Sequence, residues 1–367
     1  MNLPNQVWRA AEAFQLPGAL IGVEAHGEGL IHDTFVVSTG ACGNPERFIL
    51  QRINQQVFTS PEDLMGNIER VVLHLQMRAI QSERDPKRNV VSLIRTEAGK
   101  TWHESAGQAW RMVRYIEGTE TIDQAPTVEQ AREIGEAFGG FLEDLSDFPL
   151  ELLRTVLPGY RDTVRYLASL WQVVKQDPFN RTRDAREEIA FIESRIDDAT
   201  RIQNLQQRGE IPKRVIHGDT KLNNVLLDIE TGVGVCVIDL DTVMPGLLLH
   251  DIGDCVREAL VGNPQHRESL DAHDRRIFEA VVAGFLAKVS APPAELQIAN
   301  IVAGVKSITL ELGARFLGDF LSGDAYFKTS HPRGNLQRAG QHFRFFRMIE
   351  SCEGELQSIV QRCASGI

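Results

Sequence analysis

Residues 215–254 read VIHGDTKLNNVLLDIETGVGVCVIDLDTVMPGLLLHDIGD, and the rest of the chain is best interpreted from this stretch. Two short apolar runs, 223–227 and 235–238, are separated by a segment that carries Asp and Gly, which predicts a β-hairpin. A tight hairpin brings its outer ends together, so we expect Asp219, Asn224 and Asp239 to lie close to one another. Oxygen ligands without a nearby cluster of Cys or His suit a hard cation such as Mg²⁺.

The spacing of these three residues matches the requirements of phosphoryl transfer. In that reaction one Asp accepts the proton of the attacking hydroxyl, while an Asn and a second Asp hold Mg²⁺ on the nucleotide phosphates. Protein kinases use the Asp of an H-x-D motif, an Asn five residues later and a further Asp in these roles. We assign Asp219 as the base and Asn224 and Asp239 as metal ligands. The alternative is a chance polar cluster at the end of a hairpin.

Two further residues of this stretch have more than one interpretation. His217 could be the base itself, but the corresponding His of kinases is a structural anchor, and we favour that role here. Asp241 lies two residues after Asp239, on the same side of an extended chain. It either helps to bind Mg²⁺ or stabilises the turn.

The bulk composition excludes several classes of protein. With 367 residues the chain is too long for a single hydrophobic core, which favours two lobes. A formal net charge of −11 argues against binding nucleic acid through phosphate contacts. No apolar run has the length of a membrane span, the N-terminus lacks a signal-peptide core, and the five cysteines lack disulfide or zinc spacing. We expect a cytoplasmic monomer or homodimer without membrane or nucleic-acid partners.

The central stretch resembles a known family. HGDTKLNNVLLD (217–228) followed by VIDLDTVMPG (237–246) is similar to the aminoglycoside phosphotransferase-like small-molecule kinases, and most similar to their N-acetylhexosamine 1-kinase branch. RFLGDFLSGDAYF (315–327) and GEGLIHDTF (27–35) also resemble that branch, although His32 stands where Asn is usual. The resemblance implies an α+β, protein kinase-like fold that uses ATP and Mg²⁺. It would have a small antiparallel-sheet N-terminal lobe (1–116) and a larger, mainly helical C-terminal lobe (117–367).

The N-terminal lobe is predicted as a small sheet with two helices. Helical spacing of apolar residues predicts helices over 5–16 and 61–82, the second capped by Thr59 or Ser60. Strands are predicted over 19–23, 31–38, 47–54, 90–95 and 109–116. The turn that contains Gly27 and Gly29 and leads to Thr34 is expected to cover the nucleotide phosphates through backbone N–H groups. It could also be an ordinary hairpin turn.

The strand 47–54 lacks the Lys that contacts the phosphates in kinases. Alternation along a strand places Gln51 and Arg52 on opposite faces. Arg52 is chemically the better phosphate partner, unless it is only a solvated charge, whereas alignment with the family puts Gln51 nearer the Lys position. Glu62 and Glu69 of the following helix are either partners for such a cation or surface charges. The missing Lys also leaves open a nucleotide-binding scaffold without catalysis.

The segment after the last predicted strand should connect the two lobes. By analogy with kinases, residues around Tyr115 and Glu117 are expected to contact adenine. Asp251 resembles the family's Asp that braces the catalytic loop. Helices are predicted over 127–146, 159–174, 183–208, 251–261, 272–289 and 295–320, with a capping box at Thr127 and a loop after Phe320.

The expected acceptor is a small molecule, because no Ala-Pro-Glu segment or long activation loop follows Asp239. The polar, aromatic-rich segment 311–346 suits sugar recognition, unless it only tethers the last helix. By resemblance the acceptor is an N-acetylhexosamine phosphorylated at its anomeric hydroxyl. Aminoglycosides, choline, homoserine and methylthioribose are the alternatives. We assign acceptor binding to Asp219, Lys221, Asp241, Arg315 and Tyr326.

Overall fold

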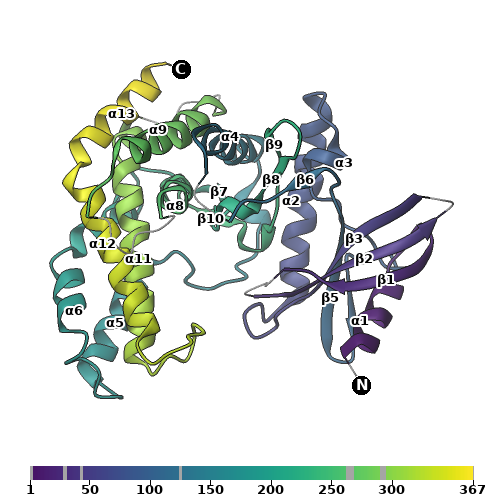
Figure 1. The fold of residues 1–367 in the computed structure, drawn as a ribbon, viewed down its shortest axis with the longest axis horizontal. Helices are drawn as coiled ribbons and strands as arrows, with labels where there is room; N and C mark the ends of the chain where they lie inside the picture. Colours follow the sequence, from purple (N-terminus) through teal and green to yellow (C-terminus); the bar gives the residue numbers. More distant parts are fainter. Residues whose placement is uncertain are drawn as a thin grey trace.

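The computed structural model describes residues 3–27, 31–41, 44–123, 126–261, 268–289 and 295–366. A sheet-rich N-terminal part and a larger helical part lie side by side (Figure 1). The chain passes from one to the other after β5 (Gln108–Arg114), because β6 (Thr119–Glu120) already pairs with a strand of the helical part. This arrangement confirms the expected α+β fold with a small antiparallel sheet and a mainly helical second half.

The N-terminal sheet is antiparallel, with the strand order β1-β2-β3-β5-β4. The remaining strands are β1 (Ala19–Ala25), β2 (Asp33–Ala41), β3 (Asn44–Arg52) and β4 (Trp102–Ser105). Helix α1 (Leu3–Glu12) covers one face, on which Phe48, Leu50 and Trp110 are buried. Because side chains alternate along a strand, the cross-strand neighbours Gln51 and Arg111 point to the other face.

One predicted strand is wrong. Residues 90–95 form no strand of the sheet: Leu93 makes an isolated bridge to Val113, and the Ile94 N–H donates to the Met112 carbonyl at 2.9 Å. The outer strand is β4, which pairs with residues 108–111 of β5. Segment 92–94 therefore reaches only the end of β5 that β4 leaves free, which is too short a contact to build a strand.

Helix α2 (Pro61–Gln81) lies between the sheet and the helical part (Figure 1). It begins as predicted, with the Asp63 N–H donating to the Ser60 hydroxyl at 3.2 Å and Pro61 in its first turn. Its apolar face, which includes Leu64, Ile68 and Val71, joins the main hydrophobic core. The short helix α3 (Pro86–Asn89) follows it.

The helical part is arranged around α11 (Ile301–Leu321), which is buried along most of its length and packs against α5, α7, α8 and α12 (Figure 1). The other helices are α4 (Val128–Asp144), α5 (Thr163–Gln176), α6 (Arg186–Glu193), α7 (Ile196–Gln207), α8 (Leu248–Leu260), α9 (Ala272–Ala287), α10 (Glu295–Ile298), α12 (Gly334–Ser351) and α13 (Glu353–Ser365). Helix α4 begins with the predicted capping box between Thr127 and Gln130. Within the described residues, no helix is both long enough and apolar enough to cross a lipid bilayer.

Several helix predictions differ from the structure in their limits; the predicted helix 5–16 ends at Glu12, and the predicted helix 251–261 begins at Leu248. The predicted helix 183–208 is interrupted at 194–195 and forms α6 and α7, and the predicted helix 295–320 forms α10 and α11. The predicted helix 159–174 begins only at Thr163, because Gly159 and Arg161 have positive φ angles of 80° and 58°. That left-handed loop carries a functional consequence that is described below.

Short strands and 3₁₀ turns build the centre of the molecule. Strands β8 (Val225–Asp228) and β9 (Gly234–Val237) form the predicted hairpin, and β7 (Arg214–Ile216) pairs with β10 (Met244–Gly246). The 3₁₀ turns η1 (Leu150–Leu152), η2 (Leu222–Asn224) and η3 (Leu240–Thr242) complete the elements. Turns η2 and η3 lie at the open end of the β8–β9 hairpin, where the predicted functional residues are found.

Candidate active site

The hairpin brings the predicted base and metal ligands together. Val225 pairs with Val237, and the Ile238 N–H donates to the Asn224 carbonyl at 2.9 Å, so Asn224 lies beside the start of the Asp239 turn. The Asn224 amide nitrogen in turn donates to the Asp219 carbonyl at 2.8 Å. The three side chains therefore share one end of the hairpin, as phosphoryl transfer requires.

The loop that carries Asp219 is held from its buried side. The N–H groups of His217 and Gly218 donate to the two oxygens of Asp251 at 2.7 and 2.9 Å. The fully buried His217 ring lies edge-on to Phe138, and its Nε2 donates to the Ile238 carbonyl at 2.9 Å. Its Nδ1 accepts the Asp219 N–H at 3.3 Å. Both ring nitrogens are thus used internally, which supports an anchoring role for His217 rather than a role as base.

Gly218 is required by the shape of this loop. Its φ is +82°, and a Cβ atom at this position would lie 2.8 Å from the Thr242 carbonyl oxygen. The Thr242 hydroxyl also donates to the His217 carbonyl at 2.7 Å. The catalytic loop and the turn after Asp239 are therefore packed directly against each other, so a shift in one would displace the other.

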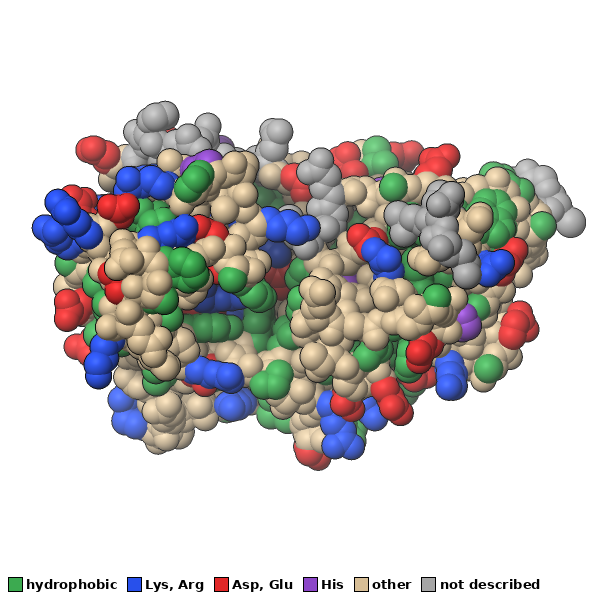
Figure 2. Space-filling view, turned by 90° about the horizontal axis from the view of Figure 1, so that it is seen from below, with side chains coloured by type: hydrophobic (Ala, Val, Ile, Leu, Met, Phe, Trp, Pro, Cys, Tyr) green, Lys and Arg blue, Asp and Glu red, His purple; other side chains and the backbone are tan. Residues whose placement is uncertain are grey.

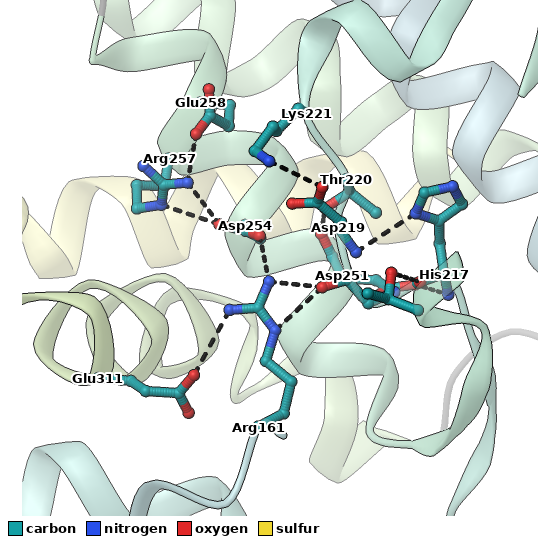
Figure 3. A network of polar contacts seen from close by, with 12 residues as sticks. Arg161, His217, Asp219, Thr220, Lys221, Asp251, Asp254, Arg257, Glu258 and Glu311 are labelled. Atoms are coloured by element: carbon teal, nitrogen blue, oxygen red, sulfur yellow. Dashed lines mark hydrogen bonds and ion pairs between the residues drawn. The ribbon is translucent and has the colours of Figure 1, made fainter. Parts of the chain in front are cut away.

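Arg161, in the loop before α5, binds the catalytic loop and also pairs with Glu311 of α11. This role was not predicted from the sequence. Figure 3 shows its guanidinium between Asp254 and Glu311. It donates to the Gly218 carbonyl through Nε at 3.1 Å and Nη2 at 2.6 Å, and to Asp254 at 2.6 Å. The Tyr160 hydroxyl donates to the same carbonyl at 2.7 Å. The left-handed loop before α5 thus directs three donors at the residue next to Asp219.

Lys221 is placed where it can act together with the base. Its ammonium group lies 2.8 Å from the Asp219 carboxylate (Figure 3). Burial opposes the charge on Lys221, but the carboxylates of Asp219, Asp254 and Asp239 raise its pKa. A lasting positive charge beside the base suits a site in which an anionic phosphoryl group must approach a carboxylate.

Asp239 has the surroundings of a cation ligand. It adopts a left-handed conformation, with φ 61° and ψ 62°, and its side chain is open to the cleft. Partial desolvation and the carboxylates of Asp241 and Asp219 raise its pKa, because they disfavour a further negative charge. A bound cation would relieve this repulsion. The contact between Asn224 and the Asp219 carbonyl uses the amide nitrogen and leaves the Asn224 side-chain oxygen for the same cation.

These ligands fit a metal that is bound together with phosphates. Within the described residues no group of three or more His, Cys, Asp and Glu could hold a metal ion alone. Mg²⁺ is usually held by one or two protein carboxylates, with water and substrate phosphates filling its other positions. Asn224 and Asp239 fit that pattern of a nucleotide-dependent metal site.

The contacts of Asp241 favour the second of its two predicted roles, stabilisation of the turn, over binding of Mg²⁺. It is buried, and both of its oxygens accept from Arg111, while His32 Nε2 lies 2.5 Å from Oδ2. Burial alone would raise its pKa, but Arg111 and His32 hold it well below the usual range. A paired and buried carboxylate is not open to an acceptor or a metal. Asp241 instead joins the sheet to the turn η3.

The residues expected near the nucleotide phosphates lie at two different faces of the sheet. Arg52 forms an ion pair with Asp33 and lies over the Trp110 ring on the α1 face. Gln51 lies on the opposite face, where its amide nitrogen is 3.3 Å from the Thr34 hydroxyl. This geometry favours Gln51 over Arg52 as the residue that faces the cleft.

The predicted phosphate-covering turn is only partly described. Gly27 has a positive φ of 66°, and a Cβ there would meet nothing within 4 Å. Gly29 lies outside the described residues. On the far side of the turn, the Thr34 carbonyl accepts the His26 N–H at 2.9 Å. The two strands that flank the turn are thus held together close to Gly27.

Tyr115 and Glu117 lie in the connection between the two parts, as expected. The Tyr115 N–H donates to the Arg47 carbonyl at 3.1 Å, and the Glu117 carbonyl accepts from Arg88 at 2.9 Å. The Glu117 carboxylate binds Arg47, which also stacks on the Tyr115 ring at 4.0 Å. An adenine contact would therefore use the remaining backbone groups of this segment.

Two residues predicted to bind the acceptor, Arg315 and Tyr326, lie on α11 and in the loop that follows it. Arg315 follows Glu311 by one helical turn and stacks on Tyr166 and Phe327, at 4.9 and 5.5 Å. Tyr326 is 65% exposed and is fixed through its N–H, which donates to Asp319 at 2.8 Å. Seen from below, the molecule has a hollow between its two halves, where basic and hydrophobic side chains meet (Figure 2). The loop 322–333 thus places Phe327 beside Arg315 of α11, with the exposed Tyr326 next to Phe327.

Comparison with known proteins agrees with this geometry. The sequence profile of the phosphotransferase enzyme family matches residues 22–285, which is more than half of the chain. The chain therefore belongs to this family, and it is a small-molecule phosphotransferase of the aminoglycoside phosphotransferase and choline kinase type. Enzymes of this kind phosphorylate hydroxyl groups of small molecules.

Solved structures with a similar fold cover nearly the whole chain. An amicoumacin kinase in complex with AMP-PNP, Ca²⁺ and Ami has a TM-score of 0.61 and 12% identity, over 94% of each chain. An aminoglycoside phosphotransferase from Alicyclobacillus acidocaldarius has a TM-score of 0.55 and 13% identity, over 98% of this chain and 96% of the other. A choline kinase from Cryptosporidium parvum has a TM-score of 0.54 and 12% identity, over 92% and 91%. These similarities confirm the protein kinase-like fold.

Proposed function

We propose that the protein transfers the γ-phosphoryl group of ATP, with Mg²⁺, to the anomeric hydroxyl of an N-acetylhexosamine. The observation that carries the proposal is the arrangement at the open end of the hairpin, where Asp219, Asn224 and Asp239 meet beside Lys221. We further propose that residues 1–116 form the nucleotide-binding lobe and residues 117–367 the catalytic and acceptor-binding lobe.

Asp219 is the group that would accept the proton of the sugar hydroxyl. Its loop is fixed by Asp251 and Arg161, so the carboxylate keeps a defined position relative to the cleft. Lys221 would balance the charge of the incoming phosphoryl group as that proton moves onto Asp219. Asn224 and Asp239 would hold Mg²⁺, which when bound neutralises the phosphates.

Aromatic side chains on the side of α11 support a neutral sugar as acceptor. The Arg315 guanidinium lies over the rings of Tyr166 and Phe327. Tyr326, the residue before Phe327, is exposed. Aromatic faces beside polar groups suit a sugar ring with its hydroxyls.

Placement of the segment 315–327 also supports the sugar. Helix α11 brings Arg315 beside Glu311, which binds Arg161 and hence belongs to the network that holds the catalytic loop. The segment that resembles the N-acetylhexosamine 1-kinase branch in sequence thus begins one helical turn after a residue that helps to hold the loop of the predicted base.

A screen of ADP release tests the proposal. Mg-ATP is offered with N-acetylglucosamine, N-acetylgalactosamine, plain hexoses, aminoglycosides, choline, homoserine and methylthioribose. The matched control is the methyl glycoside of N-acetylglucosamine, which lacks only the anomeric hydroxyl. We expect turnover with the free N-acetylhexosamines and none with the glycoside.

Other results of this screen would contradict specific parts of the proposal. Turnover of the methyl glycoside would move the reaction to another hydroxyl, and turnover of a cationic acceptor alone would exclude the sugar. Nucleotide binding without turnover on any acceptor would favour the non-catalytic scaffold.

A further inference from the structure

A buried arginine, Arg111, lies on β5, next to the strand on which kinases carry their phosphate-binding Lys. β3 has no Lys, and its cleft-facing residue is the neutral Gln51. Directly opposite Gln51 on β5 lies Arg111, which is 4% exposed and donates through Nε to the Gln51 side-chain oxygen at 2.9 Å. Arg52, the other basic candidate, lies on the α1 face. Arg47 of β3 lies on the same face as Gln51, but its side chain is partly exposed and pairs with Glu117. The buried cation of this face is therefore Arg111 on the neighbouring strand.

Arg111 has a carboxylate partner from the other half of the molecule. Its two terminal nitrogens donate to the two oxygens of Asp241, one of them at 2.8 Å, in a bidentate ion pair. The carboxylates of α2 do not have this role, since Glu69 binds Arg95 at 2.6 Å and Glu62 and Asp63 are exposed. A buried ion pair thus spans from the N-terminal sheet to the turn η3.

His32 completes the contact as a neutral donor. Its Nδ1 accepts the Asn54 N–H at 3.0 Å, which requires an unprotonated Nδ1 and leaves the ring proton on Nε2. Nε2 therefore donates that proton to Asp241 at 2.5 Å. Two donors from different strands hold one carboxylate, and only Arg111 brings a formal charge.

The position of Asp241 transmits this contact to the metal site. Asp241 lies two residues after Asp239, within the tight turn η3 that follows the left-handed Asp239. Fixing Asp241 therefore fixes the backbone of the turn from which the Asp239 side chain projects. Burial opposes the charge on Arg111, but the carboxylates of Asp241 and Asp239 raise its pKa.

We propose that Arg111 is the positioning residue by which the N-terminal sheet aligns the metal–phosphate end of the site, in place of the strand lysine of kinases and with Asp241 as its partner. This inference rests on the proposed nucleotide site. Binding of Mg-ATP should require the ion pair between Arg111 and Asp241, whereas binding of the nucleoside part of ATP should not. The acceptor does not enter the inference.

The test measures affinity for Mg-ATP by calorimetry, together with the melting temperature. For Arg111→Gln we expect a Kd for Mg-ATP that is about 100-fold higher. The Kd for AMP without metal should change less than about twofold. Arg111→Lys should recover part of the loss, because Lys keeps the charge but not the bidentate geometry. Arg114→Gln is the control, since Arg114 is on the same strand and pairs with Glu46 away from the cleft.

A double variant separates positioning from folding. Arg111→Gln leaves Asp241 buried without its cation and is expected to lower the melting temperature. Arg111→Gln with Asp241→Asn removes both charges and should regain the melting temperature while Mg-ATP affinity stays low. Recovery of both properties would overturn the proposal, because Arg111 would then only neutralise Asp241.

The remaining outcomes are also decisive. An Arg111→Gln protein that binds Mg-ATP as tightly as the wild type would overturn the inference and leave the proposed function intact. A wild-type protein that does not bind Mg-ATP would overturn the proposed function first, and the inference with it.

Discussion

Arg111 and Arg161 are both buried arginines in ion pairs near the predicted catalytic residues, but they join different parts of the molecule. Arg111 connects the N-terminal sheet to the turn after Asp239, across the cleft. Arg161 connects a loop and α11 to the carbonyl beside Asp219, within the helical part alone. The base is therefore positioned by one half of the molecule, whereas the metal ligand depends on contact between both.

The two sets of contacts would respond differently to a separation of the two halves. Such a separation would break the contact of Asp241 with Arg111 and His32, but would leave the contacts of Gly218 with Arg161 and Tyr160 intact. The predicted base would keep its support, whereas the turn after the predicted metal ligand would lose it.

Asp219→Asn should have the largest effect on catalysis. The amide cannot accept the proton of the hydroxyl, so kcat should fall by about 10³-fold, while the Kd for Mg-ATP changes little. The measurement is steady-state turnover together with calorimetry. Asp147→Asn, which changes an exposed carboxylate paired with His74, is the matched control. An Asp219→Asn enzyme with normal kcat would exclude Asp219 as the base.

Asp239→Asn should have the next largest effect on catalysis. It should lower kcat but raise the stability of the metal-free protein. Loss of the metal carboxylate should lower kcat by about 10²-fold and raise the Mg²⁺ concentration for half-maximal rate. Without metal, the variant should melt at a higher temperature, because the carboxylates of Asp241 and Asp219 no longer face a third one. A lower melting temperature in metal-free buffer would contradict the electrostatic description of this site.

Arg161→Met is the direct counterpart of Arg111→Gln. It leaves Glu311 and Asp254 with fewer partners and should cost about 3 kcal/mol of unfolding free energy. Loosening of the Gly218 carbonyl should lower kcat on the order of 10-fold, while the Kd for Mg-ATP stays near the wild-type value. Equal losses of Mg-ATP affinity in both variants would break the division between the two arginines.

The part of this site that could be predicted from the sequence is the part whose residues lie close together along the chain. The predicted base and metal ligands lie between residues 219 and 239, at the two ends of one short hairpin, so their spacing predicts their proximity. Arg111 and Asp241 are separated by 130 residues, and Arg161 and Glu311 by 150. No local pattern connects such pairs, and the absent Lys in strand 47–54 pointed only to Gln51 or Arg52 of the same strand.

Local signals also explain which elements were predicted well. Caps at Ser60 and Thr127 depend on neighbouring residues and were found at the expected positions. The strand predicted over 90–95 was wrong because β4 occupies the same edge of β5. Only the isolated bridge between Leu93 and Val113 is left for segment 90–95. The left-handed Arg161 could not be predicted, since non-glycine residues rarely adopt positive φ.

Arg315→Met should have the smallest effect of the series and should concern the acceptor alone. Loss of the guanidinium between Tyr166 and Phe327 should raise the KM for the sugar by roughly 10-fold, with kcat and the KM for ATP nearly unchanged. Arg347→Met, which removes an exposed arginine stacked on Phe191, is the control. An unchanged sugar KM would remove Arg315 from the acceptor site.

The most direct test of the central claim follows the phosphorus itself. Wild-type protein is incubated with Mg-ATP and N-acetylglucosamine, and the products are observed by ³¹P NMR. The account predicts ADP and a sugar phosphate whose phosphorus couples to the anomeric proton, in equal amounts, and neither product with Asp219→Asn. ATP that stays intact, or ADP that forms with inorganic phosphate alone, would contradict the account.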